Sequence, residues 1–164
     1  MSIVGQVNEY ISQKYPEVGT VTMRYAEIAV AVAESICSRK FAKATHTERT
    51  IAYRGMVFVS NTPLHDVVSV KDVEMGYEFN IKSFIPEGII FLEYNNRRLW
   101  VEVKYVGGYE TLPNDLVFAI GELAYYLFKH EPNIESLRGG DFTVNIADLP
   151  QVVLEVLNRY RGEL

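Results

Sequence analysis

The residues of this sequence best suited to metal binding or nucleophilic chemistry are three histidines and one cysteine. His46, His65 and His130 lie far apart, and none belongs to a His-x-x-x-His or cysteine-histidine spacing that would indicate zinc. Isolated histidines in a turn or near a helix end are usually solvated or cap the helix. We therefore expect no metal site and no bound cofactor.

The candidates for a nucleophile or a general acid and base are equally sparse. Cys37 lies in an apolar helical stretch, where a cysteine usually behaves as a small buried hydrophobic side chain. Asp66, Asp72 and Glu74 fall around an expected strand and turn, where charged side chains are usually solvated. The residues favour a protein that is not an enzyme, and a small hydrolase built on His65, Asp66 and Asp72 is the less favoured alternative.

Charge and hydropathy exclude two further classes. With a net charge of -5, the chain lacks the excess of lysine and arginine that drives nucleic-acid binding. The basic pairs Arg39-Lys40 and Arg97-Arg98 are too short to bind DNA alone, and Gly107-Gly108 lacks the spacing of a phosphate-binding loop. The apolar run from Ile28 to Ala33 is far shorter than the roughly 20 residues that cross a bilayer. We expect neither sequence-specific DNA binding nor a membrane span.

Four segments have apolar residues at helical spacing. The first is capped by Ser2 and ends before Pro16, and the third begins at Pro113 and ends before Pro132. A short fourth helix follows Asp148. The expected buried stripes of the second and third helices are Val21, Tyr25, Ile28, Ala29, Val32 and Ile36, and Leu116, Ala119, Ile120, Leu123, Ala124 and Leu127.

The middle of the chain is rich in β-branched and aromatic residues interrupted by turn formers. Leu99, Val101, Val103 and Tyr105 alternate with polar residues, so they should share the buried face of the last strand. Asn95-Asn96 predicts a hairpin between the last two strands. The expected strands are Thr47 to Tyr53, Met56 to Val59, Val67 to Val73, Tyr77 to Lys82, Gly88 to Tyr94 and Leu99 to Val106.

This order of elements predicts an α+β fold, a small bundle of about four helices with an inserted antiparallel β-rich region at 45–106. We expect a single domain overall, with a body at 1–134, a flexible link at 135–148 and a C-terminal helix or arm at 149–164. Two interpretations of that helix stay open, because it can dock on the body or bind a groove of a partner. Its apolar side comprises Val152, Val153, Val156, Leu157 and Tyr160.

The segment from Val103 to Ile120 resembles the adaptor, or head-completion, proteins that lie beneath the portal of long-tailed bacteriophages. It is similar to that family's strand with Tyr-x-x-Gly-Tyr, followed by Pro-x-Asp-Leu at the start of a helix. Tyr25 to Phe41, Thr47 to Val73 and Leu149 to Arg161 resemble further stretches of the family in the same order. The matching motif residues are Tyr105, Gly108, Tyr109, Pro113, Asp115 and Leu116, for which a structural role is expected.

The resemblance implies a structural protein of the virion, made in the cytoplasm of the bacterial host and located in the connector. It implies a ring of about twelve copies that binds the portal, receives a further connector or tail protein and lets DNA pass through a central channel. A tail-completion or other morphogenesis protein is the alternative. The candidate portal-binding arm comprises Val152, Val153, Val156, Leu157, Tyr160 and Arg161. The isolated protein is expected to be a monomer or a weak oligomer.

Overall fold

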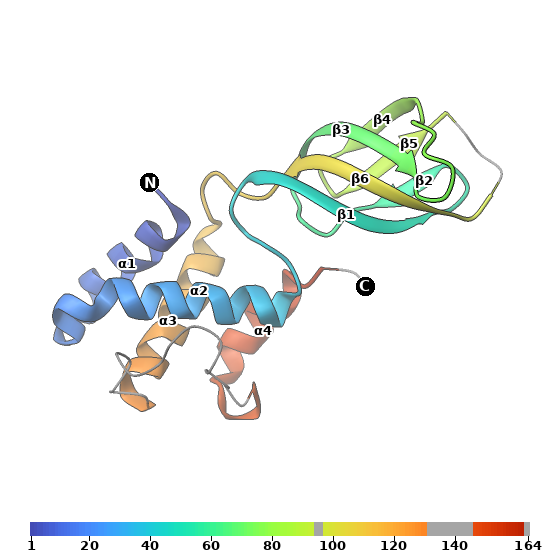
Figure 1. Ribbon diagram of the computed structural model, residues 1–164. Helices are drawn as coiled ribbons and strands as arrows, with labels where there is room; N and C mark the ends of the chain where they lie inside the picture. The colour runs from blue at the N-terminus through green and yellow to red at the C-terminus, as the bar shows by residue number, and fades with distance from the viewer. Residues whose placement is uncertain (94–96, 131–145, 163–164) are drawn as a thin grey trace. The chain divides into compact units, whose positions relative to one another are not determined.

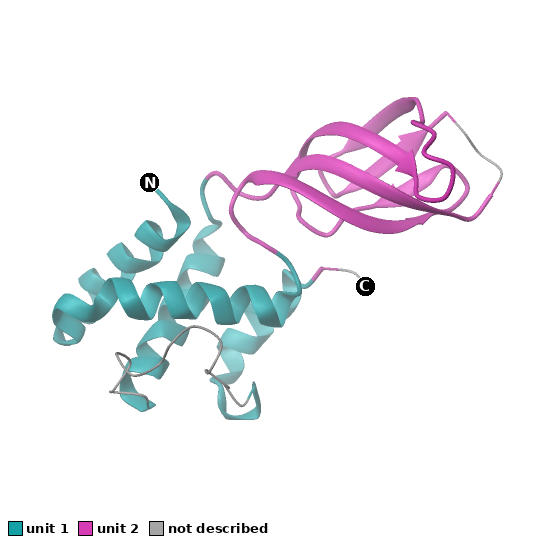
Figure 2. Cartoon of the chain, in the orientation of Figure 1, with its two compact units in different colours: residues 1–39, 111–161 teal, residues 40–110, 162–164 magenta. Residues whose placement is uncertain are grey.

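The structure is a computed structural model that describes residues 1–93, 97–130 and 146–162 (Figure 1). It consists of two compact units, shown in different colours in Figure 2. Unit 1 comprises residues 1–39 and 111–161, and unit 2 comprises residues 40–110 with 162–164. Helices and two antiparallel three-stranded sheets confirm the α+β class. The expected link at 135–148 lies largely outside the described residues, so the layout of body, link and arm stays a prediction.

Unit 1 is a bundle of helices. The oxygen of the Ser2 side chain accepts a hydrogen bond from the Gly5 amide at 3.0 Å and caps the first helix as predicted. Pro16 lies in the 3-10 segment that follows that helix. The elements of unit 1 are α1 (Ile3–Lys14), η1 (Pro16–Val21), α2 (Thr22–Cys37), α3 (Asn114–His130), η3 (Ile146–Asp148) and α4 (Gln151–Arg159).

The buried face of α2 agrees with the predicted stripe at Tyr25 and Ala29 but not at its other positions. Ile28, Val32 and Ile36 are only partly buried, whereas Ala26 and Ala33 are fully buried. Helix α2 packs against α1, α3 and α4, and small side chains let those helices approach closely. Because α2 carries apolar residues around most of its circumference, spacing alone did not identify the inner stripe. That stripe is Thr22, Tyr25, Ala26, Ala29, Val30, Ala33 and Cys37.

Helix α3 buries the stripe that the sequence predicted, and it also buries Gly121. A Cβ atom at Gly121 would lie 2.1 Å from Cδ1 of Tyr10, so this glycine allows α1 and α3 to approach each other closely. The Tyr10 ring is itself held, since its hydroxyl donates a hydrogen bond to Glu122 at 2.6 Å. The contact between α1 and α3 therefore depends on the absence of a side chain at position 121.

Unit 2 contains two sheets of three strands. In one sheet the order is β1-β6-β3, and in the other it is β2-β5-β4, with all neighbours antiparallel. Figure 1 shows the strands of the two sheets lying over each other, and their inward side chains form one core. The strands are β1 (Ala44–Ala52), β2 (Met56–Phe58), β3 (Leu64–Asp72), β4 (Ile81–Ile85), β5 (Ile89–Leu92) and β6 (Leu99–Gly107).

Two strand predictions were wrong and one pattern was confirmed. The expected strand from Tyr77 to Lys82 lies instead at Ile81–Ile85, because residues 77–79 pair only briefly with β3, through the bridge of Glu78 to Lys71. The expected hairpin between the last two strands does not form, since β5 pairs with β2 and β4 while β6 pairs with β1 and β3. The alternation along β6 was correct, because Val101, Val103 and Tyr105 are fully buried.

Replacement of Gly121 by alanine tests the close approach of α1 and α3. Alanine normally stabilises a helix by about 1 kcal/mol relative to glycine. Here the added methyl group meets the Tyr10 ring, so we expect Gly121→Ala to lower the free energy of unfolding, by roughly 1–3 kcal/mol for an overpacked core. Urea denaturation of the full chain measures the change, and a stabilised variant would contradict the packing described.

Candidate functional site

Two of the three histidines that could have formed a metal site are used in backbone contacts. His46 Nε2 lies 3.2 Å from the carbonyl oxygen of Gly107, and His65 Nε2 lies 2.7 Å from that of Gly108. His130 packs against the ring of Tyr126 instead. Within residues 1–93, 97–130 and 146–162, no three histidine, cysteine, aspartate or glutamate side chains are placed to hold a metal ion.

The carboxylates considered for acid and base chemistry do not converge. Asp72 is buried, and its Oδ1 accepts hydrogen bonds at 2.8 Å from the amides of Glu74 and Met75. Asp66 Oδ1 accepts a hydrogen bond from the adjacent Val67 amide. Both carboxylates thus hold local backbone geometry, and they do not form a pair that shares a substrate.

Cys37 is buried in unit 1. Its Sγ lies 3.3 Å from the carbonyl oxygen of Leu157, to which the thiol donates. Burial raises the pKa of Cys37 to about 11, so the thiol stays protonated near neutral pH. The thiolate that nucleophilic chemistry requires is therefore not populated.

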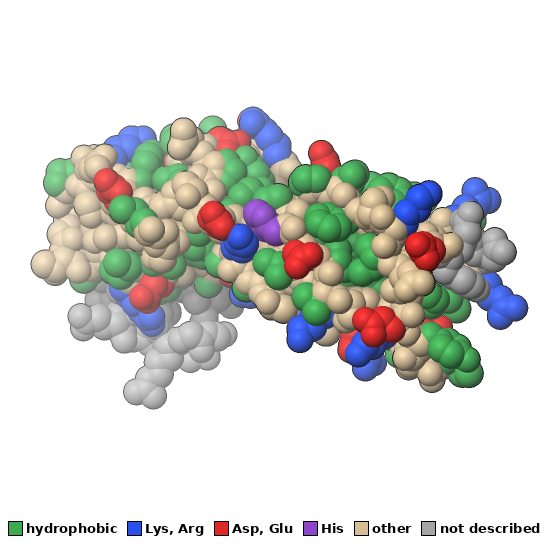
Figure 3. Space-filling model, turned by 90° about the horizontal axis from the view of Figure 1, so that it is seen from above, with side chains coloured by type: hydrophobic (Ala, Val, Ile, Leu, Met, Phe, Trp, Pro, Cys, Tyr) green, Lys and Arg blue, Asp and Glu red, His purple; other side chains and the backbone are tan. Residues whose placement is uncertain are grey.

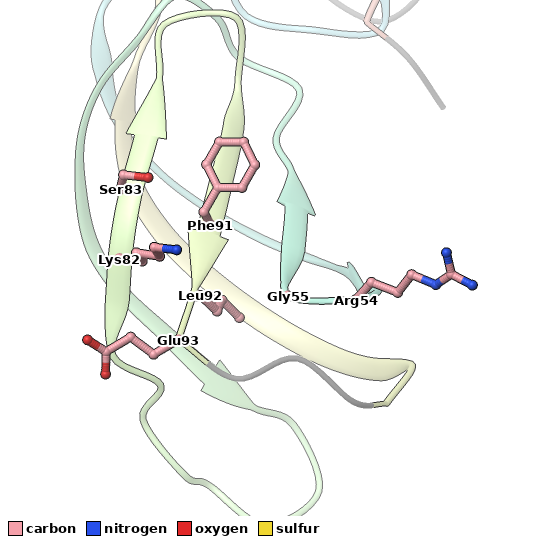
Figure 4. Close-up of a pocket in the computed structure, with 7 residues that line it drawn as sticks. All are labelled: Arg54, Gly55, Lys82, Ser83, Phe91, Leu92 and Glu93. Atoms are coloured by element: carbon pink, nitrogen blue, oxygen red, sulfur yellow. The ribbon is translucent and has the colours of Figure 1, made fainter.

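One surface hollow of unit 2 brings charged and apolar side chains together without an active-site arrangement (Figure 4). It has a volume of about 380 Å³. Figure 4 shows the Arg54 side chain pointing away from Lys82 and Ser83, so the polar ends do not converge on one point. The lining residues are Arg54, Gly55, Lys82, Ser83, Phe91, Leu92 and Glu93.

Tyr105, the first residue of the sequence motif, is the centre of a buried polar network in unit 2. Its hydroxyl accepts hydrogen bonds from the amide and Nδ2 of Asn61, at 3.1 and 2.9 Å, and donates to Glu48 Oε2 at 3.0 Å. Glu48 Oε1 accepts the Ser60 amide at 3.0 Å. Burial, aided by the nearby Glu48 charge, raises the pKa of Tyr105 to about 12. The network joins β1 and β6 to the segment after β2.

Gly108 and Tyr109 join the two ends of unit 2. The Tyr109 amide donates to the Phe41 carbonyl at 2.6 Å, and the Lys43 amide donates to the Tyr109 carbonyl at 3.0 Å. Gly108 has a φ of 107°, and a Cβ atom there would lie 2.5 Å from the Ala42 carbonyl oxygen. Only glycine allows the two segments to run side by side at this distance.

Pro113, Asp115 and Leu116 build the start of α3. The Pro113 carbonyl accepts hydrogen bonds from the Leu116 and Val117 amides, and Leu116 is fully buried. Asp115 Oδ1 accepts the Tyr160 hydroxyl at 2.6 Å. The motif therefore also connects α3 to the residue at the end of α4.

The candidate arm residues fall into two groups. Val153, Val156 and Leu157 are buried in unit 1, where α4 packs against α2 and α3. Val152 is 49% exposed and Arg161 is exposed. The sequence left two interpretations of this helix, docking on the helical body or binding to a partner. The buried inner face of α4 agrees with docking on the body. Portal binding by these residues stays a prediction.

A polar cluster of unit 1 was missed in the sequence. The hydroxyls of Tyr10 and Tyr15 each donate to one carboxylate oxygen of Glu122 at 2.6 Å, and Lys14 forms an ion pair with the same carboxylate. Lys14 Nζ also lies 5.5 Å or less from the ring centroids of Tyr10, Tyr15 and Phe118. The Tyr10-x-x-x-Lys14-Tyr15 spacing places these groups together, but nothing local points to Glu122, more than 100 residues away.

Glu122 is the ionisable group at the centre of this cluster. Burial alone would raise the pKa of Glu122, but hydrogen bonds from Lys14, Tyr10 and Tyr15 outweigh burial and lower it. The pKa of Lys14 is raised, first by its hydrogen bond to Glu122. The cluster therefore stays charged at neutral pH and ties α1 to α3.

Charges on the described surface are mixed. Figure 3 shows acidic and basic side chains interspersed over the face in view, with hydrophobic side chains between them. Residues 40–110, the main segment of unit 2, contain nine basic and nine acidic residues and so have no net charge. Among the described helices, none is long and apolar enough to cross a membrane.

Comparison with known proteins identifies this architecture. The head completion protein family matches residues 3–162 of the chain. No curated relative matches the sequence.

Solved structures with a similar fold come from gene transfer agent particles. A chain of the neck of the empty particle, computed with C6 symmetry, has a TM-score of 0.58 and 15% identity over 100% of this chain and 94% of that chain. A chain of the native neck, computed with C12 symmetry, gives the same values. A chain of the native virion has a TM-score of 0.61 and 17% identity over 98% of this chain and 89% of that chain. At these identities the likeness establishes the fold.

Removal of the Tyr105 hydroxyl tests the buried network of unit 2. Tyr105→Phe leaves Glu48 and Asn61 without their shared partner, so we expect the free energy of unfolding to fall by roughly 1–3 kcal/mol. Tyr77→Phe is the control, because Tyr77 is 63% exposed, and it should change stability by less than about 0.5 kcal/mol. Equal effects in urea denaturation would show that the network does not stabilise the unit.

Replacement of Glu122 by glutamine tests the cluster of unit 1 through its pH dependence. The pKa of Glu122 is lower in the folded state than in the unfolded state. The stabilisation that the Glu122 carboxylate gives the fold is therefore complete above the unfolded pKa and is lost as pH falls through the folded pKa. We expect Glu122→Gln to destabilise the protein by roughly 1–3 kcal/mol at pH 7, and the difference from wild type to shrink below about pH 4. Glu9→Gln, on the exposed side of α1, should have a far smaller effect. A difference that is independent of pH would contradict the charged cluster.

Proposed function

Because this chain belongs to the head completion protein family, we propose that it is a structural component of the connector that joins the head of a tailed phage or phage-like particle to its tail. The family match over residues 3–162 is the observation that carries this proposal. The contacts of the motif residues support it. Tyr105, Gly108 and Asp115 hold the fold together through hydrogen bonds and a close backbone approach.

Such a component functions by binding to other proteins of the particle. The side chains of Cys37, His46, His65 and Asp72 are used in internal hydrogen bonds, which supports a function that resides in surfaces. Contacts repeated by rotation close a ring when the rotation between neighbours divides a full turn. The neck structures with C6 and C12 symmetry have a similar fold, which supports a ring of about twelve copies beneath the portal.

The charge of the chain suits a channel through which DNA moves. The net charge is -5, and the described residues on the face in Figure 3 show acidic side chains between the basic ones, so that face offers no continuous basic track for phosphates. Lysine and arginine contacts would hold the DNA, whereas a mildly acidic wall lets it slide. A ring of these copies continues the portal channel without binding DNA in a sequence-specific way.

The outer side of α4 and the residues after it form the surface proposed to bind the portal. Val153, Val156 and Leu157 anchor the helix to unit 1, so Val152 and Arg161 stay available to a partner. Each copy makes only a small contact with the portal. Because the copies are linked in a ring, once one is bound the others bind at a high effective concentration, and the affinity of the whole ring is much higher than that of one copy. The isolated chain is therefore a monomer or a weak oligomer that assembles on the portal, and a further connector or tail protein binds the assembled ring.

Imaging of labelled particles tests the proposed position. The chain carrying a small C-terminal tag, bound by an antibody fragment, should give density at the junction of head and tail. Density confined to the far end of the tail, or to the head shell, would overturn the connector role. Density only at the tail side of the junction would indicate a tail-completion protein.

Replacement of Val152 tests the proposed portal contact. Val152→Asp places a charge on the exposed side of α4, so we expect binding to the cognate portal ring to weaken about tenfold or more while stability changes by less than about 0.5 kcal/mol. Glu9→Gln, on the exposed side of α1 and outside the proposed surface, is the control and should leave portal binding unchanged. Portal binding is measured by co-sedimentation, and unchanged binding of Val152→Asp would exclude this surface.

A further inference from the structure

Two tyrosine rings of unit 1 lie face to face. The ring centroids of Tyr15 and Tyr125 are 3.7 Å apart, and the planes of the two rings differ by only 1°. Tyr15 lies between α1 and η1, whereas Tyr125 lies far along the chain in α3. Neither side chain is fully buried, so reagents in solution can reach the pair. The helical bundle thus holds two phenol groups in direct contact.

Each of these phenols donates a hydrogen bond to a different carboxylate. The Tyr15 hydroxyl donates to Glu122 Oε2 at 2.6 Å, and the Tyr125 hydroxyl donates to Glu17 Oε1 at 3.0 Å. Glu17 lies in η1 and Glu122 lies in α3, so the two segments exchange hydrogen bonds across the ring stack. Burial and the hydrogen bond to Glu122 raise the pKa of Tyr15, so its hydroxyl keeps its proton near neutral pH.

This arrangement favours loss of an electron and a proton together. Removal of an electron from a phenol turns its hydroxyl into a strong acid, and a carboxylate at hydrogen-bond distance accepts the proton as the electron leaves. The ammonium groups of Lys14 and Lys129 each lie 5.3 Å from the ring centroid of Tyr15 and Tyr125, respectively. A cation at that distance disfavours a ring that keeps a positive charge. Transfer of the proton to the carboxylate removes that charge, so both rings are suited to become neutral phenoxyl radicals.

Two phenoxyl radicals in contact couple through the carbon atoms next to their oxygen-bearing carbons. We propose that Tyr15 and Tyr125 form a dityrosine cross-link when a one-electron oxidant, such as a haem peroxidase with hydrogen peroxide, reaches the protein. Each tyrosine gives one electron to the oxidant and one proton to its carboxylate, and a carbon-carbon bond forms as the rings tilt out of their parallel stack. The hydrogens of the two bonded carbons move to the phenol oxygens as the rings regain aromaticity. Hydrogen peroxide takes up the two electrons and two protons and leaves as two molecules of water.

The cross-link joins the segment between α1 and η1 covalently to α3. It closes a loop that contains residues 40–110, the main segment of unit 2. Closing a long loop lowers the entropy of the unfolded chain, so the oxidised protein should be more stable than the reduced one. This inference goes beyond the proposed function and does not depend on it.

Peptide mapping after oxidation tests the cross-link. The dilute full-length protein, treated with a haem peroxidase and hydrogen peroxide, should yield joined peptides with a mass two hydrogen atoms below their sum. Fragmentation should locate the bond at Tyr15 and Tyr125, and the product should unfold at a higher urea concentration. Absence of this bond, or bonds formed only by the exposed residues Tyr53 and Tyr77, would overturn the proposal.

A matched pair of variants tests the choice of partner. Tyr125→Phe keeps a ring in the stack but lacks the hydroxyl, so it should abolish the cross-link to Tyr15. Tyr126→Phe is the control, because Tyr126 is the next residue of α3 and packs against His130 instead. Circular dichroism checks that each variant folds. A cross-link that is lost in Tyr126→Phe, or that joins Tyr15 to another tyrosine in equal yield in Tyr125→Phe, contradicts the assignment.

Removal of one proton acceptor tests the role of the carboxylates. Glu17→Gln can still accept the hydrogen bond of Tyr125 through its amide oxygen, but the amide is a far weaker base. Because Glu17 is exposed, the variant should fold normally, and the initial rate of cross-linking should fall severalfold. Dityrosine fluorescence measures the rate, and Glu9→Gln should leave it unchanged. Equal rates in Glu17→Gln and wild type would contradict the carboxylate-assisted oxidation.

Discussion

The insertion of a β unit into a helical bundle imposes one constraint, namely that the chain must leave and return at one place. The close approach of residues 107–109 to residues 41–43 meets this constraint within unit 2. It depends on Gly108, because any side chain there would meet the Ala42 carbonyl. The buried hydroxyl of Tyr105 fixes the strand that leads to this point by bonding Asn61 and Glu48. Strands β1 and β6 stay in register because this junction holds their ends.

Several of the residues considered for chemistry in the sequence form hydrogen bonds within the fold. Cys37, His46, His65 and Asp72 each form a hydrogen bond with a backbone group. An unsatisfied polar group in the interior costs more than a hydrogen bond contributes, so these side chains are committed to the fold. What stays free on the surface is apolar or charged area, which suits association.

The sequence predicted where helices and strands lie better than it predicted which of them pack or pair with one another. Local signals such as the Ser2 cap, Pro113 at the start of α3 and the alternation along β6 were correct, because each depends on neighbouring residues only. The wrong hairpin between β5 and β6 and the rotated stripe of α2 depend on which distant element packs against them. Glu122 was missed for that reason, and the expectation of a solvated Asp72 was wrong because its carboxylate is buried against the amides of Glu74 and Met75.

The hydrogen bonds that shape the turn after β3 involve Asp72 and backbone atoms, and none of them uses the side chain of residue 74, 75 or 77. Those three positions can therefore change identity while the loop keeps its conformation. Substitutions at these outward positions therefore change the chemistry of the loop surface at little cost to folding, because the Asp72 carboxylate alone among the side chains sets the path of the backbone.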